Sequence, residues 1–221
     1  MIVRLHSTPS TMQDASALAA KGAAHGTVVV AECQTAGIGR HGHSWHSAPD
    51  GGLYFSMILR LNSPGPAVTL ALGLAVQAAI EDTDLRWPND VMLHNRKLAG
   101  ILVQAAEGAL IAGIGVNVNQ SSFPDELRDI ATSLRLETGF EHDKDAILHR
   151  IIAETLRTVQ FSKNDVIRRF EERSSYARGR EVEVDGKLRG VTAGLDADGF
   201  LLLRTDSGIE RIVAGGVRPV H

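Results

Sequence analysis

This sequence predicts a fold that combines α-helices with β-strands and ends in a small β-barrel. Helical and strand patterns alternate through residues 1–174. After residue 174 the sequence pattern changes: turn dipeptides recur between short apolar runs. Their spacing of roughly ten residues is typical of a small barrel. We therefore predict one domain over residues 1–174 and a second over residues 175–221.

Each element of the first domain has its own signal. Ser10 and Thr11, followed by an alanine-rich run, predict a capped helix. The β-branched run at 27–31 predicts a buried strand, and residues 53–61 predict a second one. The later elements are predicted as an interior helix at 67–82, strands at 91–93 and 98–104 joined by a turn, a strand at 110–119, and helices at 145–161 and 165–173.

Composition narrows the class of protein. The 221 residues are 43% hydrophobic and 22% charged, which is ordinary for a globular chain. The net charge of −3 argues against a dedicated nucleic-acid binder, since phosphate neutralisation needs a basic surface. A single cysteine excludes an intramolecular disulfide framework and fits a reducing compartment. Residues 1–11 carry no apolar signal segment, and the apolar run at 66–80 is too short to span a bilayer, so we predict a cytoplasmic protein with no membrane partner.

Two clusters in the first half of the chain could hold a ligand. Ser10 and Thr11 serve either as a helix cap or, with the first N–H groups of the helix, as a site for a polar ligand head. The glycine-containing loop at 34–45 lets backbone N–H groups approach an anion, and Arg40 adds a guanidinium. Trp45 either packs at the hinge of this loop or faces the ligand. Three neighbouring histidines, which lack a rigid geometry and a nearby carboxylate, are expected to face solvent rather than bind a metal: His41, His43 and His46.

Two further clusters lie between residues 86 and 119. Asn89 and Asp90 follow a proline, where such a pair forms a turn or presents an amide and a carboxylate to a ligand. Lys97 opens an apolar strand, so its stem packs on apolar surface or its amine binds an anion. Asn117 and Asn119 alternate with valines and are expected on one face of a strand. Because asparagine disfavours strands, the pair is predicted to bind something.

The order of these motifs resembles a known family over essentially the whole chain. Ser-Thr is followed by Gln-Thr-Ala-Gly-x-Gly-Arg-x-Gly-x-x-Trp, Trp-Pro-Asn-Asp, Lys-Leu-Ala-Gly-Ile-Leu and Gly-x-Gly-x-Asn-Val-Asn. This series resembles the biotin protein ligases, the biotin–[acetyl-CoA-carboxylase] ligases. The resemblance implies an α+β fold with a mixed β-sheet and helices packed on one face, as in class II aminoacyl-tRNA synthetases, followed by a small SH3-like β-barrel.

The resemblance also implies an activity and a site. The enzyme would join biotin to ATP, giving biotinyl-5′-AMP and pyrophosphate with Mg²⁺ present, and pass biotin to a lysine of a biotin carboxyl carrier protein. Lys97 and Arg40 would be catalytic. Biotin would meet Ser10, Thr11, Met12, Gln34, Gly37, Ile38, Gly39, Arg40, Lys97, Gly100 and Gly115. ATP would meet Trp45, Trp87, Asn89, Asp90 and Asn117, with Asp90 also holding Mg²⁺.

Two departures qualify the resemblance. The family loop reads Gly-Arg-Gly-Arg-x-Gly-Arg, and here Ile38 and His43 replace its first and last arginines, which puts firm retention of the adenylate in doubt. The sequence starts just ahead of the first motif, so we expect a monofunctional ligase without an N-terminal helix-turn-helix domain and without DNA binding. A monomer and a homodimer are both left open.

Three other functions are weighed against this interpretation. A lipoate ligase or octanoyl transferase of the same architecture would carry an Arg-Arg-x-x-Gly-Gly-Gly-type loop, which is absent from the sequence. A biotin-binding sensor without catalysis fits the Ile38 departure, but Lys97, Asp90 and Trp45 argue against it. The third is a metal-dependent hydrolase built on the three histidines.

Overall fold

The computed structural model describes residues 1–47, 49, 51–62 and 65–220. The chain divides into two compact units. Unit 1 comprises Met1–Pro64 and Leu93–Ile152, and unit 2 comprises Gly65–Met92 and Ala153–His221. The helix α4 (Lys144–Thr158) begins in unit 1 and ends in unit 2.

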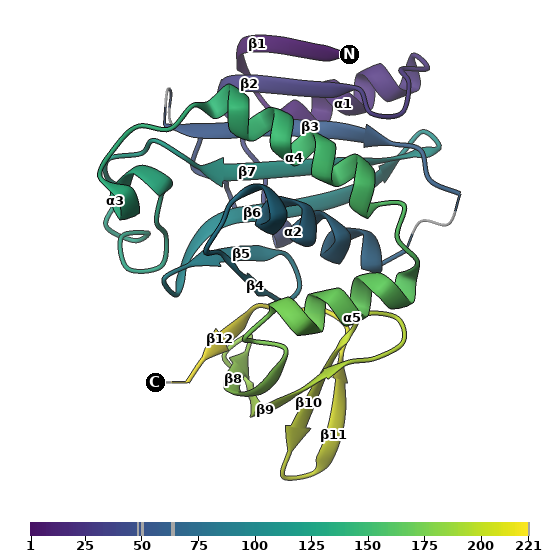
Figure 1. The fold of residues 1–221 in the computed structure, drawn as a ribbon, viewed down its shortest axis with the longest axis vertical. Coiled ribbons are helices and arrows are strands. Elements are labelled where there is room, and N and C mark those ends of the chain that lie inside the picture. The colour runs from purple at the N-terminus through teal and green to yellow at the C-terminus, as the bar shows by residue number, and fades with distance from the viewer. Residues whose placement is uncertain (48, 50, 63–64, 221) are drawn as a thin grey trace. The chain divides into compact units, whose positions relative to one another are not determined.

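Unit 1 is built on a mixed β-sheet (Figure 1). Its strands follow the order β1 (Ile2–Thr8), β2 (Val28–Gln34), β3 (Gly52–Leu59), β7 (Ala109–Asn117) and β6 (Arg96–Ala106). β1 pairs with β2 in parallel, and the other neighbours are antiparallel. The mixed sheet confirms the fold class predicted from the motifs.

The helix α1 (Thr11–Ala20) covers part of this sheet and contacts β2, β3 and β7. Small residues bring the helix close: Ala15 and Ala19 are buried against Val29 of β2 and Ile111 of β7. At Gly113 the approach is tightest, because an added Cβ would lie 2.7 Å from Met12 Sδ. A glycine at this strand position is therefore required by packing.

Unit 2 contains two helices that pack together, α2 (Ala67–Ala79) and α5 (Lys163–Arg173). Nearly every side chain of α2 is buried, as predicted for an interior helix. α2 also contacts β4 (Asp84–Arg86), which forms an antiparallel hairpin with β5 (Asp90–Leu93).

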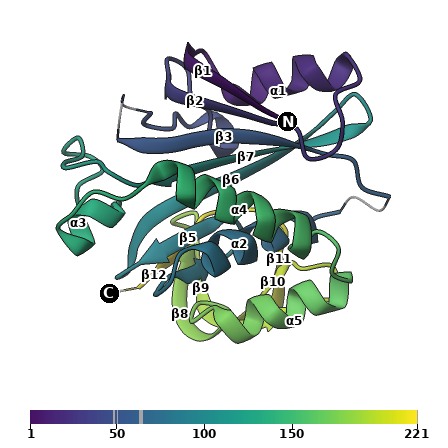
Figure 2. The ribbon, with the colours of Figure 1, turned by 45° about the horizontal axis from the view of Figure 1, so that its top comes forward.

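The last strands of unit 2 form an antiparallel sheet in the order β11-β10-β9-β8-β12 (Figure 2). Its strands are β8 (Arg178–Val184), β9 (Leu188–Leu195), β10 (Leu201–Thr205), β11 (Gly208–Ile212) and β12 (Val217–Pro219). The three turns from β8 to β11 fall at the turn dipeptides of the sequence, Asp185-Gly186, Asp198-Gly199 and Ser207-Gly208, and each of these glycines has a positive φ. The β-rich C-terminal part is confirmed, and the boundary at residue 174 stays a prediction.

Several predicted boundaries were wrong. β7 ends at Asn117 and not at residue 119, α2 ends at Ala79, and β2 continues to Gln34. Elements that were not predicted include β1, the short helix α3 (Leu134–Thr138) and a 3-10 turn at Arg40–Gly42. Across the described residues, none of the helices combines the length and the apolarity needed to cross a bilayer.

Arg60 fastens the sheet of unit 1 to the end of α1. Its Nη2 donates to the Ala19 carbonyl at 3.1 Å, and its Nε donates to the Ala23 carbonyl at 3.2 Å. These carbonyls lie at the C-terminal end of α1 and just beyond it, where a helix leaves acceptors unsatisfied and favours a positive charge.

We therefore expect Arg60→Ala to lower the free energy of unfolding by about 2 kcal/mol, the value of one or two charge-assisted hydrogen bonds. Urea denaturation measures the change, and Arg60→Lys should recover part of it through its charge. An unfolding midpoint equal to that of the native chain would show that these bonds are replaced by water at no cost.

Candidate active site

Two paired glycines form a flat surface on β6 and β7, two neighbouring strands of the unit 1 sheet. The antiparallel register of β6 and β7 places Gly100 directly opposite Gly115. The indole of Trp45 lies over both: an added Cβ on Gly100 would be 2.7 Å from Trp45 Cζ3, and one on Gly115 would overlap the indole more closely still. We call Gly100 and Gly115 the glycine floor.

Lys97 lies at the edge of the glycine floor. Its Nζ is 5.3 Å from the centroid of the Trp45 ring, and it would be 3.2 Å from a Cβ built on Gly100. A cation at this distance from an indole face is attracted by the ring quadrupole. Three of the residues predicted to bind biotin or ATP, which come from two separate motifs, therefore meet at one point: Lys97, Gly100 and Trp45.

The loop that carries Trp45 is folded back on itself. The Trp45 N–H donates to the Gly37 carbonyl at 2.9 Å, and the Gly39 N–H donates to the His43 carbonyl at 2.6 Å. A Cβ on Gly37 would lie 2.8 Å from the Trp45 carbonyl oxygen, so this crossing needs a glycine. Ile38 and His43 are exposed on the outside of the loop.

Gln34 links this loop to the start of α1. Its Oε1 accepts from the N–H and the Oγ1 of Thr11, at 2.9 and 3.1 Å, and its Nε2 donates to Ser47 Oγ at 3.1 Å. Ser47 in turn donates to the Trp45 carbonyl at 3.2 Å. The side chain of Ser10, at the N-cap position, makes no capping bond. The cap predicted for Ser10 is thus supplied by Gln34 from β2.

The three histidines of the loop region do not form a metal centre. His41, His43 and His46 are all exposed. In the part of the chain that the structure describes, no three His, Cys, Asp or Glu side chains converge as metal ligands. The geometry thus gives no support to a hydrolase built on these histidines.

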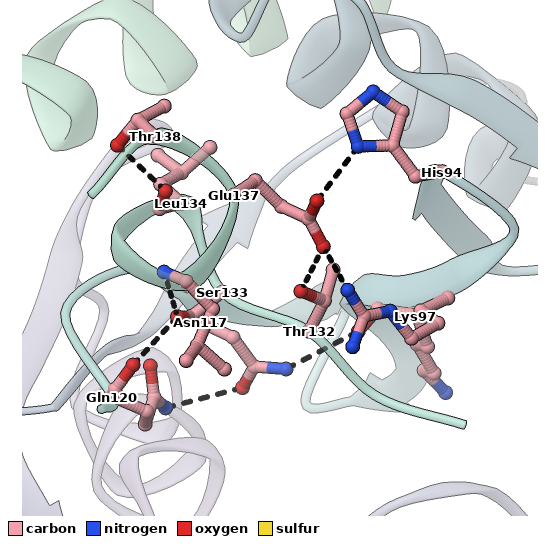
Figure 3. Close-up of polar contacts among 11 residues, drawn as sticks. His94, Lys97, Asn117, Gln120, Thr132, Ser133, Leu134, Glu137 and Thr138 are labelled. Carbon is pink, nitrogen blue, oxygen red and sulfur yellow. Dashed lines mark hydrogen bonds and ion pairs between the residues drawn. The ribbon is translucent and has the colours of Figure 1, made fainter. Parts of the chain in front are cut away.

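A chain of buried amides runs beneath the site (Figure 3). Asn117 Nδ2 donates to the Lys97 carbonyl at 3.3 Å, and Gln120 Nε2 donates to Asn117 Oδ1 at 3.2 Å. Gln120 Nε2 also lies 3.4 Å from the Tyr54 hydroxyl, and burial raises the pKa of that phenol despite this bond. Asn119 does not share the face of Asn117, and both ends of its amide bond the backbone of His142. The prediction that Asn117 and Asn119 lie on one face of a strand was wrong because β7 ends at Asn117.

A carboxylate that the motifs did not indicate contacts Arg96, the residue before Lys97. Glu137 of α3 pairs with Arg96 Nη2 at 2.6 Å and with His94 Nδ1 at 2.7 Å, and it accepts a short hydrogen bond from Thr132 Oγ1 (Figure 3). Burial alone would raise the pKa of Glu137, but the bonds from Thr132 and His94 and the charge of Arg96 lower the pKa below its ordinary value. The group therefore stays ionised at neutral pH.

The Trp-Pro-Asn-Asp motif belongs to unit 2. Trp87 is buried, and its indole N–H donates to the Gly199 carbonyl at 3.0 Å, which gives the side chain a packing role. Asp90 Oδ2 accepts from Arg86 Nη2 at 2.7 Å. A single carboxylate already paired with an arginine does not make a Mg²⁺ site by itself, although Mg²⁺ commonly binds one carboxylate together with substrate phosphates. The role of Asp90 as a metal ligand stays a prediction.

A pocket that the motifs did not indicate opens beside the amide chain in unit 1. It has a volume of about 740 Å³, within the range of small-molecule sites. Its lining comprises His46, Pro49, Gly51, residues 119–124 and three charged side chains: Arg135, Glu141 and Lys144. The one sequence signal is the polar run Gln120-Ser121-Ser122 ahead of Phe123, which has no helical or strand periodicity.

Comparison with known proteins identifies the family. Residues 5–121 match the biotin/lipoate A/B protein ligase family, and residues 179–217 match the biotin protein ligase C-terminal domain. The chain belongs to the biotin/lipoate A/B protein ligase family. The membership predicted from the motifs is confirmed, and the two matches cover both ends of this ligase chain.

Individual relatives agree with this membership. The bifunctional ligase/repressor BirA of Bacillus subtilis is 38% identical over 94% of this chain and 70% of its own length. The biotin–[acetyl-CoA-carboxylase] ligase of Mycobacterium tuberculosis is 35% identical over 97% of this chain and 86% of its own length. The structure of the Aquifex aeolicus biotin protein ligase in complex with biotin and ATP covers 99% of both chains at 32% identity, with a TM-score of 0.88.

Most of the predicted site residues fall into three groups. Of the others, Ser10 is the N-cap residue of α1, and Ile38, Gly39 and Arg40 lie on the loop 37–45. Thr11, Gln34, Gly37, Trp45, Lys97, Gly100, Gly115 and Asn117 form one connected site in unit 1. Met12 is a residue of α1 whose side chain is buried in the core, where it packs against Gly113 of β7. Trp87, Asn89 and Asp90 belong to unit 2. The individual ligand roles of all these residues stay predictions.

Gly115→Ala should displace Trp45 from the glycine floor, because the new methyl group would overlap the indole. We expect a red-shifted tryptophan emission as the indole meets water, with the fold retained. The matched control is Gly22→Ala, since a Cβ at that exposed turn meets nothing within 4 Å, although its positive φ costs some stability. Unchanged emission from the Gly115 variant would mean that the sheet yields instead of the loop.

Proposed function

We propose that this chain is a biotin protein ligase. It activates biotin with ATP to give biotinyl-5′-AMP and pyrophosphate, and it transfers biotin to a specific lysine of a biotin carboxyl carrier protein. The observation that carries the proposal is the Lys97 amine at the edge of the glycine floor, in a chain whose catalytic and C-terminal regions both match the biotin ligases.

The first step requires positive charge at the reacting centre. The carboxylate of biotin attacks the α-phosphorus of ATP, the bond to the β-phosphate oxygen breaks, and pyrophosphate leaves. Because two anions approach each other, Lys97 and Arg40 are assigned to offset the repulsion and to stabilise the charge of the transition state. ATP brings Mg²⁺ with its phosphates, and Asp90 is the residue proposed to hold that ion.

The second step needs the product to be kept from water. Biotinyl-5′-AMP is a mixed anhydride, and the amine of the carrier lysine attacks its acyl carbon while AMP leaves. The back-folded loop 37–45, with Trp45 on its inner side, is the proposed cover over the reacting groups. Within reach of this cover, Gly37, Ile38, Gly39 and the glycine floor are assigned to biotin, together with Ser10, Thr11, Met12 and Gln34.

The nucleotide is assigned to Trp45, Trp87, Asn89, Asp90 and Asn117. Trp45 would stack on adenine once it leaves the glycine floor, since an aromatic face suits a flat base. The proposed protein partner is the biotin carboxyl carrier protein of acetyl-CoA carboxylase or a related biotin-dependent carboxylase. We propose a cytoplasmic enzyme that acts as a monomer or homodimer without DNA binding.

Biotin is favoured over lipoate or octanoate by one observation. The family as a whole includes ligases for both kinds of acyl group, but residues 179–217 match a C-terminal domain described for biotin protein ligases. Biotin-dependent exchange of label between pyrophosphate and ATP tests the choice directly. Exchange that depends on lipoate or octanoate and not on biotin would overturn the proposed substrate, and binding of biotin without exchange would indicate a sensor.

Lys97→Ala should reduce biotin-dependent exchange by at least a hundredfold while leaving the melting temperature unchanged. Loss of one such electrostatic donor typically costs about 2.7–4 kcal/mol of transition-state stabilisation. Lys187→Ala, which removes an exposed lysine at a turn of unit 2, is the matched control and should exchange normally. A folded Lys97 variant with native exchange would contradict the role assigned to this amine.

Restoring the two missing arginines of the loop should slow escape of the adenylate. Ile38 and His43 are exposed on the loop, so both positions accept an arginine without repacking. Each new charge-assisted hydrogen bond is worth about 1.5–3 kcal/mol in a closed site. We expect Ile38→Arg with His43→Arg to slow dissociation of labelled biotinyl-5′-AMP, chased with unlabelled biotin, at least tenfold. An unchanged rate would show that the loop holds the adenylate through its backbone N–H groups.

A further inference from the structure

The main chain of Lys97 is held on both of its sides. Its N–H donates to the Ile130 carbonyl at 2.8 Å, and its carbonyl accepts from the Thr132 N–H at 3.0 Å. Lys97 and Ala131 thus form a short parallel bridge. The lysine at the reacting centre is therefore fixed to the segment 130–132, which lies outside the sheet and just before α3.

Glu137 ties that segment back to the strand that carries Lys97. Its carboxylate accepts from Thr132 on one side of the bridge and pairs with Arg96, the residue before Lys97, on the other. His94 adds a third contact from the turn between β5 and β6. Only 11% of the Glu137 side chain is exposed, whereas the side chain of His94 is 67% exposed, so the carboxylate itself is the enclosed member.

We propose that Glu137 is a positioning residue for Lys97, acting through Thr132 and Arg96. It does not touch the reacting groups. It closes a ring of contacts that runs from Arg96 to Lys97, across the bridge to Thr132, and back through the carboxylate. An ionised acceptor suits this position, since it accepts from a hydroxyl and a guanidinium together, and such bonds are about twice as strong as neutral ones. The proposal rests on the proposed function for the role of Lys97 itself.

The hydroxyl of Thr132 offers the cleanest test. Thr132→Val keeps the backbone N–H that bonds Lys97 and removes only the O–H that bonds Glu137, while Thr132→Ser keeps both. We expect Thr132→Val and Glu137→Ala to lower the exchange rate per folded molecule about tenfold and to weaken biotin binding severalfold. Thr132→Ser should keep most of the native values, and so should Glu172→Ala, which breaks an exposed pair with Arg168 on α5.

Combination with Lys97→Ala separates positioning from general loss of structure. If Glu137 acts through Lys97, Thr132→Val weakens biotin binding in the native chain and has no further effect in the Lys97→Ala chain. Two outcomes overturn the proposal. In one, Thr132→Val weakens biotin binding equally in the native chain and in the Lys97→Ala chain. In the other, Thr132→Val and Thr132→Ser have the same biotin affinity and the same pyrophosphate exchange rate.

Hydrogen–deuterium exchange gives a measurement that needs no ligand. The amides of Lys97 and Thr132 are the two that close the bridge. Both amide hydrogens should exchange with deuterium faster in the Thr132→Val variant than in the Thr132→Ser variant. Equal deuterium-exchange rates in the two variants would contradict the positioning role. If the native chain shows no biotin-dependent exchange, the proposed function fails, while these amide rates still decide whether Glu137 holds the bridge.

Discussion

The antiparallel pairing of β6 with β7, which sets Gly100 against Gly115, is the constraint on which the rest of the site depends. Two side chains other than hydrogen at these positions would raise the surface of the sheet by a methyl group and exclude the indole that now lies there. The same pairing fixes the course of β6, and with it the position of Lys97 at the start of that strand. The site therefore depends on one strand register, which brings together the loop 37–45, the glycine floor and Lys97. A shift in that register would separate these three parts.

Much of this architecture follows from local pattern. The buried helix α2 and the turns of the C-terminal sheet are dictated by apolar content and by glycines at positive φ, which act over a few residues. The sequence did not predict β1 because Arg4 and His6 interrupt its apolar residues. This strand lies at the edge of the sheet, where one face meets water. The sequence did not predict α3 because five residues are too few to show the helical period of apolar residues. Motifs located Lys97 and the glycines, but they carried no information about Glu137, whose partner Arg96 lies 41 residues away along the chain.

Trp45 shows why a motif alone does not give a geometry. Its position in the sequence is typical of a residue that meets a nucleotide, yet its indole covers the glycine floor and its Nε1 is buried with no hydrogen-bond partner among the described residues. A buried donor without an acceptor costs about 1–3 kcal/mol. The unpartnered indole N–H therefore destabilises the position of Trp45 over the glycine floor. In the proposed function, a substrate that took the glycine floor and let the indole N–H reach water or an acceptor would recover part of the free energy needed to move the loop.

Charge in this protein is arranged locally and not globally. The chain carries a net charge of −3, which gives no general attraction for an anionic substrate such as ATP. Attraction has to come from a few cations held in defined places, and a lysine has a long stem with several rotatable bonds that resist such placement. The main-chain bridge at Lys97, the amide of Asn117 on its carbonyl and the stacked indole each remove part of that freedom before any substrate arrives. An amine that is already placed needs little reorganisation in the transition state, and this is the condition under which a single positive charge contributes most to the rate.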